Sequence, residues 1–170
     1  MKKIDYLVSS FHNMQELIKF SDQKVTAILV VCSLEVTVFI NIAEKYQIGL
    51  SNIRFWGILL FVVGIIFICM IGLIIYLGIY KVLKPRFAKD YKKGTYSCYY
   101  FEHIALNSKE MLREQVEEIT EDSQINELTD QIYEIARILH NKNKYCSVLM
   151  NLVFWSTLVF MIYLLLDKLL

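Results

Sequence analysis

The feature that most constrains this 170-residue chain is a pair of long apolar runs that contain no charged residue. They cover residues 56–80 and 146–166, and a third apolar run at 25–43 holds a single charge, Glu35. The hydrocarbon core of a bilayer is about 30 Å thick, so a helix needs about 20 apolar residues to cross it. Each run comes close to or exceeds that length, and 56% of the chain is apolar. The sequence therefore predicts three transmembrane helices.

The remaining segments also favour helices, because the whole chain has only one proline and six glycines. Apolar residues recur at steps of three and four in residues 1–20, which predicts an amphipathic helix. A second periodic set of apolar residues, which we call the apolar seam, precedes the last apolar run. It comprises Ile125, Leu128, Ile132, Ile135 and Leu139, and the same spacing continues through Lys142 into the last run. No glycine or proline interrupts residues 123–170, so this helix and the third span are expected to form one rod. Ser108 and Ser123 are the expected N-caps of two helices in the polar segment.

These patterns predict an all-α integral membrane protein with about three transmembrane helices and a small helical cytosolic domain. The expected parts are a cytosolic amphipathic helix at 1–24, spans at 25–43, 56–80 and 146–166, an external loop at 44–55 and a cytosolic helical sensor domain at 81–145. The orientation follows from the basic residues. Fifteen of the 18 Lys and Arg residues lie on the side of the N-terminus and residues 81–145, and positive charge favours the cytosolic side.

Glu35 is the most informative single residue, because a carboxyl group deep in a span is costly and often functional. Ser156 or Thr157 lies at the same depth in the third span and is the expected hydrogen-bond partner. The alternatives are a role in an ion path or gate, or a contact between protomers. On the opposite side of the same helix is a polar stripe formed by Asp22, Thr26, Ser33, Thr37 and Glu44.

The polar stripe either lines a pore or lets helices approach closely. We take Glu35, Thr26, Ser33 and Thr37 as pore or gate candidates. The second span carries a glycine face that favours close packing or a gating hinge, formed by Gly57, Gly64, Gly72 and Gly78.

A basic neck, residues 81–93, follows the predicted second span, and aromatic residues follow the neck. Cations that meet a phosphate and rings that stack on a base are typical of nucleotide binding. The alternative is a positive collar with an aromatic belt at the membrane surface. The nucleotide-binding candidates are Lys84, Arg86, Lys92, Lys93, Tyr99 and Tyr100.

Signals of enzymatic chemistry are missing from the sequence. It has no glycine-rich phosphate loop, no H-E-x-x-H and no G-x-S-x-G. The three histidines are scattered and predict no metal site. We expect no catalytic residue and no cofactor.

Several short motifs occur in a recognisable order along residues 20–166. They are Asp22-Gln23-Lys24, Lys84-Pro85-Arg86, Tyr100-Phe101-Glu102-His103-Ile104, Asp130-Gln131-Ile132 and Lys144 before the last span. In this order the chain resembles the membrane-effector domain of the Pycsar anti-phage systems. The resemblance implies a multi-pass protein of the bacterial inner membrane that senses a cyclic nucleotide, or a short oligonucleotide, made by a partner cyclase or nucleotidyltransferase.

The resemblance also implies that the signal makes the effector compromise the membrane. Three spans are too few to surround a water-filled path, so a pore requires a homo-oligomer, and we expect a tetramer. Two other classes stay open: a constitutive small channel or transporter subunit, and a membrane adaptor that binds a protein partner through its acidic cytosolic helices.

Overall fold

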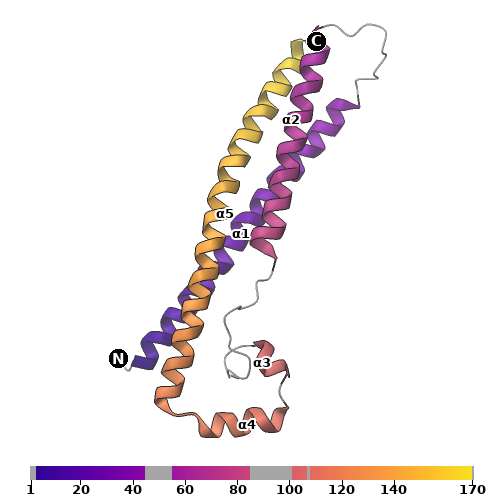
Figure 1. Cartoon of the computed structure of the whole chain (residues 1–170). Coiled ribbons are helices and arrows are strands. Elements are labelled where there is room, and N and C mark those ends of the chain that lie inside the picture. Colours follow the sequence, from indigo (N-terminus) through magenta and orange to yellow (C-terminus); the bar gives the residue numbers. More distant parts are fainter. Residues whose placement is uncertain (1–2, 45–54, 85–100, 107, 170) are drawn as a thin grey trace. The chain divides into compact units, whose positions relative to one another are not determined.

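All regular secondary structure is helical in the part of the chain that the computed structural model describes, which is residues 3–44, 55–84, 101–106 and 108–169. Figure 1 shows the elements in chain order. Three helices are long and apolar enough to cross a membrane, within Lys3–Ala43, Trp56–Leu83 and Glu121–Lys168. The predicted all-α class with three candidate spans is therefore confirmed.

The first helix, α1, runs without interruption over Lys3–Ala43. The sequence pattern separated an amphipathic helix at 1–24 from a span at 25–43. The structure instead has a single helix, because no glycine or proline lies between residues 3 and 43 to end it.

The second span consists of α2, over Phe55–Leu77, and a π-helical turn, η1, over Gly78–Leu83. The backbone N–H of Lys84 donates to the carbonyl oxygen of Ile79 at 2.8 Å, which is the five-residue spacing of a π-helix. The regular helix thus widens at the end of the span, where the basic neck begins.

Two short helices, α3 (Phe101–Leu106) and α4 (Lys109–Glu118), precede the long α5 (Glu121–Leu169). Ser108 caps α4 as predicted, since its side chain accepts from the backbone N–H of Met111 at 3.2 Å. The cap of α5 is Thr120 rather than Ser123. Each of these two side chains accepts from the other's backbone N–H, at 3.2 and 3.0 Å, in a capping box. The predicted continuous rod is confirmed by the 49 residues of α5.

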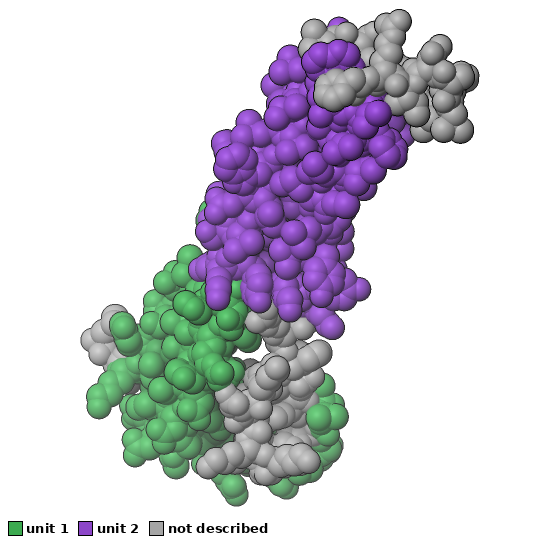
Figure 2. All heavy atoms as spheres, turned by 45° about the horizontal axis from the view of Figure 1, so that its top comes forward, with its two compact units in different colours: residues 1–20, 85–141 green, residues 21–84, 142–170 purple. Residues whose placement is uncertain are grey.

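The chain divides into two compact units, which are coloured separately in Figure 2. Unit 1 comprises residues 1–20 and 85–141, and unit 2 comprises residues 21–84 and 142–170. In unit 1 Leu128 of the predicted seam on α5 is buried, and the other four seam residues are half-buried.

Unit 2 is a bundle of three helices whose directions follow from its contacts. Val25 of α1 lies against Gly78, near the end of the second span, while Phe39 lies against Gly64, nearer its start. The second span is therefore antiparallel to α1. Asp22 pairs with Lys142 and Glu35 with Thr157, so α5 is parallel to α1.

The interior of unit 2 is tightly filled by apolar side chains, among them Phe67, Ile74 and Leu149, each less than 2% exposed. Large apolar side chains also cover its outer surface, including Phe61 at 60% and Leu165 at 61% exposure. A helix that is apolar all round is typical of a membrane span or a buried core helix. The outward apolar surface of this bundle fits contact with lipid or with further helices.

Candidate functional site

The predicted partner of Glu35 is confirmed as Thr157. The hydroxyl of Thr157 on α5 donates to Oε1 of Glu35 on α1 at 2.6 Å. Ser156, the other candidate, donates to the carbonyl oxygen of Val153 on its own helix at 2.9 Å. Glu35 is 8% exposed, and its Oε2 has no hydrogen-bond partner among the described residues. The carboxyl group therefore lies inside the three-helix bundle, with one oxygen bonded and one without a partner.

The hydroxyl groups of the polar stripe lie on a different surface from Glu35. Thr26, Ser33 and Thr37 are exposed in unit 2, whereas Glu35 is buried. Each hydroxyl donates to a carbonyl oxygen of its own helix, at 2.7 to 2.9 Å. The structure thus separates the four pore or gate candidates into one buried acid and three outward-facing hydroxyls.

A polar cluster that the sequence patterns did not assemble joins α1 to α5. Nζ of Lys142 lies 2.5 Å from Oδ1 of Asp22, and the two side chains are 7% and 35% exposed. Beside them the Ser21 hydroxyl donates to Oδ1 of Asn143 at 2.9 Å. We call these four residues the polar clasp. The sequence contains one indication of this cluster. Lys142 falls within the apolar seam, and a buried lysine needs an acidic partner.

Two members of the glycine face make close contacts within unit 2. A Cβ atom on Gly64 would meet the rings of Phe39 and Tyr163 at 3.3 and 3.4 Å, and one on Gly78 would meet Val25 at 3.3 Å. Nothing lies within 4 Å of the same position on Gly57 or Gly72 among the described residues. The close-packing interpretation therefore holds for half of the face.

Most of the nucleotide-binding candidates lie outside the described residues: Arg86, Lys92, Lys93, Tyr99 and Tyr100. Lys84 is described, at the end of η1, where its Nζ lies 6.0 Å from the centre of the Tyr80 ring. Nearby in unit 2, Nζ of Lys81 lies 6.0 Å from the centre of the Tyr145 ring on α5. The start of the neck thus combines ammonium groups with tyrosine rings.

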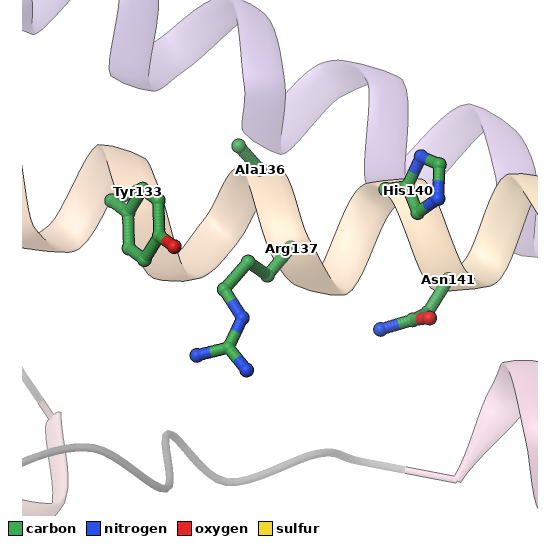
Figure 3. A pocket seen from close by; sticks show the side chains of 5 residues that line it. All are labelled: Tyr133, Ala136, Arg137, His140 and Asn141. Atoms are coloured by element: carbon green, nitrogen blue, oxygen red, sulfur yellow. The ribbon is translucent and has the colours of Figure 1, made fainter.

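A surface hollow of about 330 Å³ lies on α5 within unit 1. Its described lining consists of Tyr133, Ala136, Arg137, His140 and Asn141 (Figure 3). The Arg137 guanidinium lies 5.8 Å from the centre of the Tyr133 ring. Its Nη1 lies 3.3 Å from Oε1 of Glu134. An aromatic ring, a guanidinium, an imidazole and an amide therefore share one face of one helix.

No cluster of three or more His, Cys, Asp or Glu residues is placed to hold a metal ion within residues 3–44, 55–84, 101–106 and 108–169.

Comparison with known proteins gives a match over nearly the whole chain. The model of the Pycsar effector protein domain matches residues 6–167. The Pycsar effector protein TpPycTM of Treponema porcinum is 42% identical over 81 residues, which cover 48% of this chain and 70% of that relative. No solved structure matches the chain.

Proposed function

Because the chain belongs to the Pycsar effector family of anti-phage defence proteins, we propose that it is a nucleotide-gated effector that compromises the bacterial inner membrane. The signal would be a cyclic nucleotide, or a short oligonucleotide, from a partner cyclase or nucleotidyltransferase. In the proposed orientation the N-terminus and residues 81–145 are cytosolic, where such a signal is made.

The observation that carries this proposal is the continuity of α5. This single helix of 49 residues begins in a polar segment that bears charged and aromatic side chains and ends in an apolar span. Its span bonds to the first span through Thr157 and Glu35. The basic neck reaches this helix through Lys81, whose Nζ lies 6.0 Å from the centre of the Tyr145 ring on α5. A ligand on the neck that shifted or rotated α5 would therefore change contacts inside the apolar bundle.

The proposed ligand site is the basic neck with its aromatic residues, Lys84, Arg86, Lys92, Lys93, Tyr99 and Tyr100. Shifting a gate from 1:99 to 99:1 takes about 5.5 kcal/mol of preference for one state. Charge-assisted hydrogen bonds contribute roughly 1.5–3 kcal/mol each and base stacking about 1–3 kcal/mol. One phosphate and one base held in each protomer reach the energy that a gate requires.

The path across the membrane is proposed to form between protomers of a homo-oligomer, for which we keep the expected tetramer. The interior of unit 2 supports this, because side chains that are almost fully buried fill it. A single protomer has its one membrane-depth acid hydrogen-bonded inside the bundle rather than along an open channel.

The test is a flux assay with purified protein in liposomes loaded with a potassium-sensitive dye. Cyclic mononucleotides and short oligonucleotides are added in turn, and the paired substitutions Lys92→Ala/Lys93→Ala and Tyr99→Ala/Tyr100→Ala are compared with the wild type. Flux that appears only with a nucleotide supports the proposal. Flux without any nucleotide would instead indicate the constitutive channel, and no flux under any condition would indicate the adaptor.

A further inference from the structure

We propose that the hollow on α5 lined by Tyr133, Ala136, Arg137, His140 and Asn141 binds a nucleoside monophosphate through its phosphate and its base. The inference rests on the proposed function, because it gives the nucleotide signal a second candidate site. We call this place the α5 hollow. Its described lining includes no residue of the basic neck, so the two sites can be tested by separate substitutions.

The phosphate would bind at Arg137. A guanidinium presents a planar fork of N–H donors that matches phosphate oxygens in pairs. The Arg137 side chain is 53% exposed and is already held by the carboxylate of Glu134 at 3.3 Å. His140 and Asn141 follow at the third and fourth positions along the helix, so they lie on the same face and add further N–H groups. A phosphate would take the place of Glu134 as the acceptor for Arg137.

The base would stack on Tyr133. This ring is 63% exposed, and the Arg137 guanidinium lies 5.8 Å from its centre. A tyrosine ring open to solvent offers a face to any planar base, and stacking tolerates every base. Ala136 also lines the hollow, and its methyl group is the smallest side chain there.

The size of the α5 hollow favours one nucleotide over a chain of them. Its 330 Å³ lies at the lower end of the roughly 300–1,000 Å³ typical of small-ligand sites. Residues 133–141 span about 12 Å of helix. One ring and one guanidinium over that length match one base and one phosphate.

The position of the hollow on α5 gives its ligand a route to the bundle. In sequence Asn141 directly precedes Lys142, which forms the ion pair with Asp22 of α1. A ligand that turned this part of α5 would thus act on a helix that continues directly into the polar clasp.

The test is calorimetric titration of the full-length protein in lipid nanodiscs. The probes are cyclic UMP, cyclic AMP, uridine as the same base without phosphate, and a dinucleotide. Arg137→Gln is compared with Arg113→Gln, a matched control in unit 1 whose exposed arginine is also held by a glutamate at 3.3 Å but does not line the hollow. Tyr133→Leu is compared with Tyr6→Leu, which removes a similarly exposed ring from α1.

We expect Arg137→Gln to weaken binding of a cyclic mononucleotide about ten- to a hundredfold, and Arg113→Gln to leave it unchanged. Tyr133→Leu should weaken it about tenfold. Glu134→Gln should strengthen it severalfold, because the competing carboxylate is gone.

Normal affinity in Arg137→Gln and Tyr133→Leu, with loss only in the neck variants, overturns the α5 hollow and leaves the proposed function in place. Tighter binding of the dinucleotide than of either mononucleotide overturns the assignment of the ligand class. Wild-type protein that binds no nucleotide overturns the proposed function and this inference with it.

Discussion

Breaking the ion pair of the polar clasp should destabilise the bundle much more than breaking an ordinary surface pair. The change is Asp22→Asn, which keeps the size of the side chain and removes its charge. Lys142 is then left with a side chain that is 7% exposed and with no carboxylate at 2.5 Å. Removing one partner of a fully buried pair costs about 3–5 kcal/mol. Because Asp22 is 35% exposed, water reaches the pair from that side, and we expect a loss of about 2–3 kcal/mol.

The reverse change, Lys142→Met, should cost less. It removes the ammonium group but keeps the unbranched apolar stem that packs in the bundle. The carboxylate that remains is partly hydrated, so the expected loss is about 1 kcal/mol. The double variant buries no unpaired charge and should stay within about 1 kcal/mol of the wild type. The wild type, the two single variants and the double variant form a double-mutant cycle. The coupling energy between Asp22 and Lys142 from this cycle should be about 2 kcal/mol.

The assay is reversible unfolding in mixed detergent micelles, followed by tryptophan fluorescence, which gives the free energy of unfolding of each protein. The matched control is Glu16→Gln, which breaks the pair with Lys19. Those charges are 3.9 Å apart on side chains that are 74% and 65% exposed. We expect this control to cost less than about 0.5 kcal/mol. If Asp22→Asn costs no more than Glu16→Gln, the reasoning from burial is refuted.

Three further predictions address the acid, the glycine contact and the topology. Glu35→Gln keeps an acceptor for the Thr157 hydroxyl, so the protein should assemble normally and change its free energy of unfolding by less than about 1 kcal/mol, while Glu35→Ala should lose about 1–3 kcal/mol. Altered flux in the Gln variant with unchanged stability would show that the ionisable group is needed. Equal stability of the two variants would contradict a stabilising role of the hydrogen bond. Gly64→Val should destabilise the bundle by about 1–3 kcal/mol because its side chain meets two rings, whereas Gly72→Val meets nothing within 4 Å in the described part of the chain and should have the smaller effect in the same unfolding assay. A periplasm-active reporter should work after Leu170 and fail at Asn107, and the opposite result would rule out a cytosolic sensor.

The transmembrane helices and the rod could be predicted from sequence because both depend on local properties. The length of an uncharged apolar run and the absence of glycine and proline are visible without any partner. Each helical residue adds a fixed rise along the membrane, so counting residues placed Ser156 and Thr157 at the depth of Glu35. The residues at which helices begin were predicted less accurately. Thr120 and Ser123 cap each other reciprocally, and Glu121 with Asp122 in the first turn favours the earlier start.

The polar clasp could not be predicted in the same way, because it depends on how two helices are rotated about their own axes. The apolar seam placed Lys142 on the inner face of α5, and the structure confirms that it is buried. Its partner is 120 residues away in sequence, and the stripe pattern grouped Asp22 with Thr26 on the outer face. A lysine side chain is long enough to reach an aspartate at the edge of the interface, which a count of helical angles does not reveal.

The hydroxyls of the polar stripe, rather than Glu35, are the groups from which to expect ion selectivity. Thr26, Ser33 and Thr37 are exposed in unit 2, and each gives its own proton to a backbone carbonyl oxygen. A hydroxyl that donates in this way still has lone pairs that face outward and accept. If α1 lines the proposed path between protomers, the stripe presents acceptor oxygens, which coordinate cations and not anions.

We therefore expect nucleotide-dependent currents to be selective for cations. The measurement is the reversal potential in planar bilayers with a potassium chloride gradient. Thr37→Val removes one acceptor without changing the shape of the side chain, so it should lower the cation preference and leave stability nearly unchanged. Ser156→Ala is the matched control, because its hydroxyl is bonded to its own helix in the same manner but is fully buried. A reversal potential shifted toward the equilibrium potential of chloride would show that the stripe does not line the path. An equal change of the reversal potential in both variants would show the same.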